Sequence, residues 1–63
     1  MPVVTVQMLP GRTHAQKAEL TRVITEAIVT IAHASPEGTF VLIEEVPREH
    51  WGIGGVLVSD SSS

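Results

Sequence analysis

The chain has 63 residues and a net charge of −3, and so short a chain forms one domain at most, residues 1–63, which buries only ~60% of its unfolded surface. It has no cysteine and three widely separated histidines, which excludes disulfides and thiolate metal sites and leaves self-assembly as the means of stabilising a small core. Its four basic residues are scattered, which argues against nucleic-acid binding, and it has neither a membrane-length apolar run nor a signal peptide, so we expect a cytoplasmic protein.

A strand followed by a long helix is predicted in the first half of the chain. Val3–Leu9 is rich in β-branched residues and alternates polar with apolar positions, and a Pro-Gly pair ends it. Thr13 and Gln16 fit a capping box, so a helix should begin there and continue to about His33. Apolar positions at steps of three and four give this helix one stripe: Leu20, Val23, Ile24, Ala27, Ile28 and Ile31. Its wetter side is expected to carry Lys17, Arg22 and Glu26, the last two spaced for a weak ion pair.

The second half of the chain predicts shorter elements. They are, in order, a turn at Ser35–Gly38, a strand at Thr39–Val46, a glycine-rich turn at His50–Gly55, a short strand at Val56–Val58 and a frayed polar tail at Ser59–Ser63. The middle of the second strand is apolar on both faces, as in a strand that is covered on both sides.

The predicted fold class is α+β, with a β-α-β protomer. A crossover of about thirty residues makes the two strands parallel and the connection right-handed. A short C-terminal hairpin or strand follows. One helix covers only one face of a two-stranded sheet, so a partner must cover the other face and the edges.

Pro2 is the first candidate functional residue. If Met1 is removed, Pro2 carries a free secondary amine, whose pKa burial and a nearby cation would lower toward neutrality, where a general base works well. The plain alternative is that a proline merely begins an edge strand, where no N–H is needed.

Arg12 and Trp51 are the next candidates. Arg12 precedes the helix, where its guanidinium and the first backbone N–H groups can share an anion; the alternative is a solvated loop charge. Trp51, the only tryptophan, either lines an apolar pocket or packs in the core between subunits of an oligomer. His50 beside it would then lie near the site. The glycines that follow Trp51 lack the remaining residues of a phosphate loop, which excludes that kind of nucleotide binding.

Together these residues resemble the 4-oxalocrotonate tautomerase family over nearly the whole chain. The matching segments are Met1-Pro2 before a strand, Gly11-Arg12-Thr13 with Gln16-Lys17, Glu26-Ala27-Ile28, and His50-Trp51-Gly52-Ile53-Gly54-Gly55. The resemblance implies a hexamer built as a trimer of dimers, without cofactor or metal. It also implies an isomerase of aromatic degradation that moves a proton within an unsaturated 2-hydroxy or 2-oxo acid.

The same resemblance implies roles for individual residues. Pro2 would be the general acid and base, and Arg12 of a neighbouring subunit would bind a substrate carboxylate and draw electron density. Trp51 and Leu9 would line the substrate site. Phe40 stands where family members that isomerise dicarboxylates have a second arginine, and a phenyl ring makes no charge-assisted contact.

This departure leaves three interpretations open. The chain is a homohexameric tautomerase whose substrate is less polar at one end, or one subunit of a heterohexamer whose sister chain supplies the missing arginine, or a binding assembly without catalysis. Arg48, in the loop after the second strand, is a candidate to replace that arginine.

Overall fold

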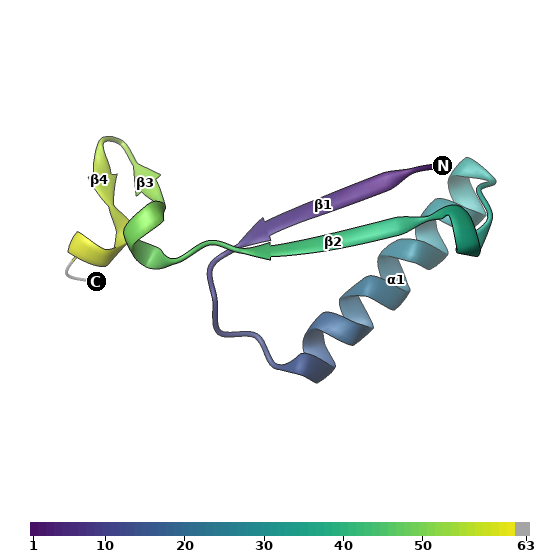
Figure 1. Cartoon of the computed structure of the whole chain (residues 1–63), viewed down its shortest axis with the longest axis horizontal. Helices are drawn as coiled ribbons and strands as arrows, with labels where there is room; N and C mark the ends of the chain where they lie inside the picture. The colour runs from purple at the N-terminus through teal and green to yellow at the C-terminus, as the bar shows by residue number, and fades with distance from the viewer. Residues whose placement is uncertain (62–63) are drawn as a thin grey trace.

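The computed structural model describes residues 1–61 and has the predicted β-α-β order (Figure 1). Its main elements are β1 (Val3–Met8), α1 (His14–Ala32) and β2 (Phe40–Glu45), and the C-terminal hairpin consists of β3 (Gly52–Ile53) and β4 (Val56–Leu57). Short 3-10 helices cover Pro36–Gly38, Arg48–His50 and Val58–Asp60. β1 and β2 pair in parallel, from Val3 opposite Phe40 to Met8 opposite Glu45. The predicted fold class is therefore confirmed.

The start of α1 is fixed by the predicted capping box. The Thr13 hydroxyl accepts a hydrogen bond from the backbone N–H of Gln16 at 3.1 Å, and the Gln16 side-chain oxygen accepts one from the backbone N–H of Thr13 at 2.9 Å. Two of the helix's unpaired N–H groups are thereby satisfied. At the other end, His33 is the C-cap in the left-handed conformation, with φ 58°.

Replacing Thr13 by Ala should lower the free energy of unfolding by about 1 kcal/mol, because an N–H of the first turn loses its acceptor. Urea unfolding at fixed protein concentration measures this loss. Thr30→Ala is the matched control, since Thr30 is an exposed residue of α1 away from the cap. Equal losses in the two variants would contradict a role for the cap.

The sheet has one covered face and one open face. The covered face carries half-buried apolar residues that meet α1: Val4, Val6, Val41 and Ile43. The open face carries exposed residues, which are Val3, Thr5, Gln7, Phe40, Leu42 and Glu44. No side chain among residues 1–61 is fully buried, so this protomer has no closed core of its own.

Only part of the predicted helical stripe packs on the sheet. Leu20, Ile24 and Ile28 are half-buried, whereas Val23 is 45% exposed and Ile31 78% exposed. Two strands ~4.8 Å apart are narrower than a helix of ~10 Å diameter, so they cannot cover the whole stripe. The placement of Lys17 on the wet side was wrong: it is half-buried, and its Nζ forms an ion pair with Glu45 at 3.2 Å.

The protomer is elongated, with extents of 43 × 24 × 14 Å. Its radius of gyration is 14.9 Å, against ~11 Å for a compact domain of this length. Its accessible surface is 4699 Å², against ~3,900 Å² for a folded monomer of this mass. The large radius of gyration and the large accessible surface are those expected of one subunit of an oligomer.

The C-terminal hairpin stands beyond the end of the sheet that is far from the N-terminus (Figure 1). Gly54 and Gly55 make its two-residue turn with φ of 59° and 88°, a backbone that only glycine adopts easily. Val58, predicted to end the last strand, instead begins a 3-10 helix, and its carbonyl accepts the Ser61 N–H at 3.1 Å. The predicted frayed tail thus starts as a helical turn, and its residues 62–63 lie outside the described part.

Candidate active site

Pro2 lies at the N-terminal end of β1. It is half-buried, and its carbonyl accepts the backbone N–H of Phe40 at 3.0 Å. The side chain of Met1 projects outward and is 90% exposed. Phe40 is 45% exposed on the open face of the sheet. We call Pro2 and Phe40 the proline half-site.

Arg12 and Leu9 lie beyond the opposite end of β1. Leu9 is half-buried, directly after the strand, and Arg12 is exposed in the loop that leads to α1. Gly11, with φ 131°, turns the chain just before Arg12. Among the described residues Arg12 has no ion pair, so its guanidinium is available to an anion.

Trp51 lies at this same end of the sheet, after β2. It lines a hollow of about 280 Å³ together with Gln7, Val46, His50 and Gly52. The hollow is open to solvent, and polar and apolar residues both line it. We call Leu9, Arg12 and Trp51 the arginine half-site.

The two half-sites of one protomer cannot meet. Seven residue steps of extended chain separate Pro2 from Leu9, which amounts to ~23 Å. The structure therefore places Pro2 and Phe40 at one end of the sheet, and Leu9, Arg12 and Trp51 beyond the other end. A site that uses both Pro2 and Arg12 must join different protomers.

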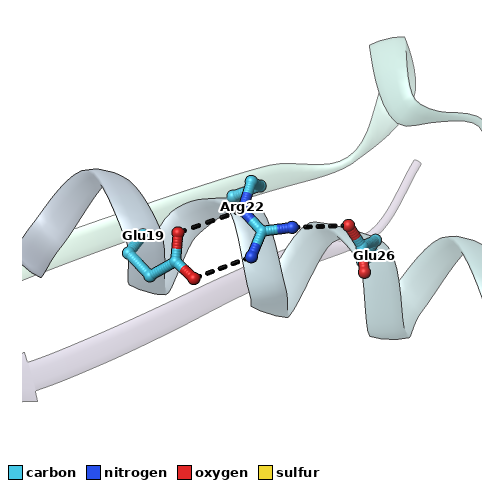
Figure 2. Close-up of polar contacts among 3 residues, drawn as sticks. All are labelled: Glu19, Arg22 and Glu26. Atoms are coloured by element: carbon cyan, nitrogen blue, oxygen red, sulfur yellow. Dashed lines mark hydrogen bonds and ion pairs between the residues drawn. The ribbon is translucent and has the colours of Figure 1, made fainter.

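Two of the other three basic residues are engaged elsewhere. Lys17 is paired with Glu45, as described above. Figure 2 shows Arg22 between two carboxylates on the outer side of α1: Glu19 accepts from Nε at 3.0 Å and from Nη2 at 2.7 Å, and Glu26 accepts from Nη1 at 2.7 Å. The hydrogen bonds and charge of Arg22 lower the pKa of Glu19, and Glu19 and Glu26 raise the pKa of Arg22. The predicted Arg22–Glu26 pair is confirmed. Such exposed pairs add little stability.

The family profile described as Tautomerase enzyme matches residues 2–61. The chain belongs to the tautomerase family. The predicted resemblance is confirmed, and the family and the names of its relatives indicate an isomerase-type enzyme.

Known tautomerases resemble the chain over nearly its whole length. The 2-hydroxymuconate tautomerase of Bacillus subtilis is 45% identical over 60 residues, which cover 95% of this chain and 97% of that protein. A probable tautomerase of Halalkalibacterium halodurans is 42% identical, and the match covers 95% of this chain and 98% of that protein. The crystal structure of YwhB, a 4-oxalocrotonate tautomerase homologue, superposes with a TM-score of 0.92 at 43% identity. This superposition covers 97% of this chain and 100% of that chain. The structure of a heterohexameric 4-oxalocrotonate tautomerase from Chloroflexus aurantiacus superposes with a TM-score of 0.86 at 33% identity. This superposition covers 95% of this chain and 97% of that chain.

Sequence reasoning missed Gln7 as a residue of this tautomerase's hollow. Its polar character in an alternating strand indicated only a surface position. The register places Gln7 opposite Glu44, whose carboxylate accepts a hydrogen bond from the Gln7 amide. His50, expected near the site because it adjoins Trp51, does line the hollow.

Nothing in the described part of the tautomerase gathers three or more metal-binding side chains into one group. The longest described helix, α1, does not have the length and apolar character needed to cross a membrane, and the other described helices are shorter.

Proposed function

We propose that this protein is a cofactor-independent tautomerase that moves a proton within an unsaturated 2-hydroxy or 2-oxo acid. The observation that carries the proposal is the placement of Pro2, which is half-buried at the end of a strand behind an outward-pointing Met1. Removal of Met1 exposes a secondary amine on a rigid ring. Partial burial of Pro2 disfavours the charged form of that amine and so favours the neutral form, which accepts a proton.

The reaction needs one base and one carboxylate ligand. The nitrogen of Pro2 takes the proton of the 2-hydroxyl group, the electron pair moves through the conjugated chain, and the protonated nitrogen returns the proton to a carbon atom, which leaves a 2-oxo acid. Arg12 binds a carboxylate of the substrate in a bidentate manner and stabilises the charge that develops. Trp51 and Leu9 exclude water.

The proposed enzyme is an assembly in which Pro2 of one protomer meets Arg12 of another. The separation of the half-sites and the absence of a fully buried side chain among residues 1–61 both support this. The proposed assembly is a hexamer built as a trimer of dimers. On the sequence grounds given above, the proposed location is the cytoplasm and the proposed role is in aromatic degradation.

Mixing two inactive variants tests the proposal directly. Pro2→Ala and Arg12→Ala chains, denatured together and refolded, should recover activity at about one quarter of the sites, because random assembly pairs an intact Pro2 with an intact Arg12 there. Each variant refolded alone is the control. If the mixture is no more active than its components, Pro2 and Arg12 do not act across protomers.

A complementary or non-catalytic subunit is the alternative function. Phe40 favours it, since the proline half-site holds a phenyl ring where the resemblance implies a second arginine, and a relative forms a heterohexamer. The discriminating measurement is an enol-acid assay on the purified single chain, whose mass shows that Met1 is absent. Activity of that chain alone excludes the alternative.

A further inference from the structure

An ion pair lies at one end of the contact between α1 and the sheet. Val41 and Ile43 of β2 face α1, and the alternation of a strand places Glu45 next on that face. On the helix, half-buried Lys17 precedes half-buried Leu20 by three residues, so both lie on the side that faces the sheet. The Nζ of Lys17 lies 3.2 Å from Oε1 of Glu45, and each side chain is 32% exposed. An otherwise apolar contact thus ends in two opposite charges.

This ion pair links the two ends of the loop that carries Arg12. The loop leaves the sheet after Met8, the last residue of β1, and Glu45 lies opposite Met8 in the register of the sheet. The loop enters the helix at Thr13, whose carbonyl accepts the backbone N–H of Lys17 at 3.1 Å. Glu45 therefore belongs to the start of the loop and Lys17 to its end, and their contact closes the loop.

The first turns of α1 have little else that holds them to the sheet. The start of α1 stands away from the strands in Figure 1, and His14–Gln16 are exposed. In the described part of the chain, the other side-chain hydrogen bonds of α1 stay within the helix or its cap, and they join Gln16 to Thr13, Thr21 to the carbonyl of Lys17, and Arg22 to Glu19 and Glu26. The contact of Lys17 with Glu45 is therefore the polar link between these turns and β2.

The place of the Arg12 guanidinium depends on how its loop is held. Arg12 is exposed and forms no ion pair among residues 1–61, so no charged neighbour in its own protomer orients the side chain. Gly11, with φ 131°, gives the loop a backbone turn that other residues rarely adopt. A displacement of the start of α1 against β2 would therefore be carried directly to Arg12.

We propose that Lys17 and Glu45 are positioning residues for the contact of Arg12 with the substrate carboxylate. The proposal rests on the proposed function, in which Arg12 of one protomer meets Pro2 of another. A loop that is held at both ends presents its guanidinium in one place, so substrate binding does not have to order it. A bidentate contact requires two parallel N–H groups in line with two oxygens, which makes it sensitive to a small displacement.

Breaking and reversing the ion pair tests the proposal. Lys17→Gln and Glu45→Gln should each lower kcat/KM about three- to fivefold, the size expected of a partly exposed ion pair. The substrate is whichever of 2-hydroxymuconate and phenylenolpyruvate the Met1-free enzyme turns over. The loss should fall on KM, because the carboxylate contact forms before the proton moves. The double Gln variant should lose no more than either single variant.

Two variants that keep an ion pair and one matched control complete the series. Lys17→Arg, and the exchange Lys17→Glu with Glu45→Lys, should both retain most of the wild-type kcat/KM. Arg22→Gln removes the same charge from the outer side of α1 and should leave kcat/KM unchanged. A loss in Arg22→Gln as large as that in Lys17→Gln would overturn the proposal, since net charge would then be the cause.

Hydrogen exchange supplies a readout that does not depend on turnover. The amides of Thr13, Gln16 and Lys17 are hydrogen-bonded in the first turn of α1, so their exchange reports its opening. Exchange there should be faster in both Gln variants and return toward the wild-type rate in the charge exchange. Unchanged exchange, or faster exchange with an unchanged KM, would overturn the proposal. Failure of the proposed function looks different, because then neither acid is turned over, or Pro2→Ala is as active as the wild type.

Discussion

Blocking the nitrogen of Pro2 should reduce the tautomerase rate by about 10²- to 10⁴-fold, the usual contribution of a general acid–base group. The cause is electronic: an amide nitrogen has no basic lone pair. A protein with a residual N-terminal tag carries this block, and the same protein cleaved by a protease so that it starts at Pro2 is its matched control. The two should have the same assembly state by light scattering and differ only in the enol-acid assay.

Pro2→Ala should reduce the tautomerase rate by an amount at the lower end of that range. A primary amine is still a base, but it is more mobile than a proline ring and has a different basicity. Intact mass must first show that Met1 is absent from both the variant and the wild type. If the tagged protein, the cleaved protein and the Pro2→Ala variant all react at the same rate, the base is a group other than Pro2.

Leu42→Lys should prevent assembly and, with it, folding of the protomer. Leu42 is 53% exposed on the open face of the sheet, in a protomer that has no fully buried side chain among residues 1–61 to stabilise it alone. Burying an unpaired ammonium against a second protomer costs several kcal/mol for each copy. A core of this size rarely supplies more than ~3–5 kcal/mol, so the penalty is as large as the stability available.

Light scattering and circular dichroism measure this outcome together. The variant should be smaller than the wild type and largely unfolded, and its melting temperature, where one exists, should rise with protein concentration. Ala15→Lys, an exposed position in the first turn of α1, is the control and should assemble normally. An intact assembly of Leu42→Lys would show that the open face stays in water.

The elements of the fold could be predicted because their signals are local. The capping box needs only Thr13 and Gln16, and the hairpin turn needs only Gly54 and Gly55, which adopt positive φ at no steric cost. The candidate residues Pro2 and Arg12 stood out for the same reason, since each adjoins the start or end of a regular element. The ion pair of Arg22 with Glu26 followed from a spacing of four.

The partner of Lys17, the exposed part of the helical stripe and the hollow around Trp51 depend instead on how distant segments pack. These features depend on the register of β1 on β2 and on the narrow width of a two-stranded sheet. No local sequence pattern encodes that register or that width. The sequence by itself determined which chemical groups are present and which elements carry them. Only the tertiary structure decided that Lys17 pairs with Glu45 and that Gln7 and Trp51 line one hollow, because each of these groupings joins segments that are far apart in the chain.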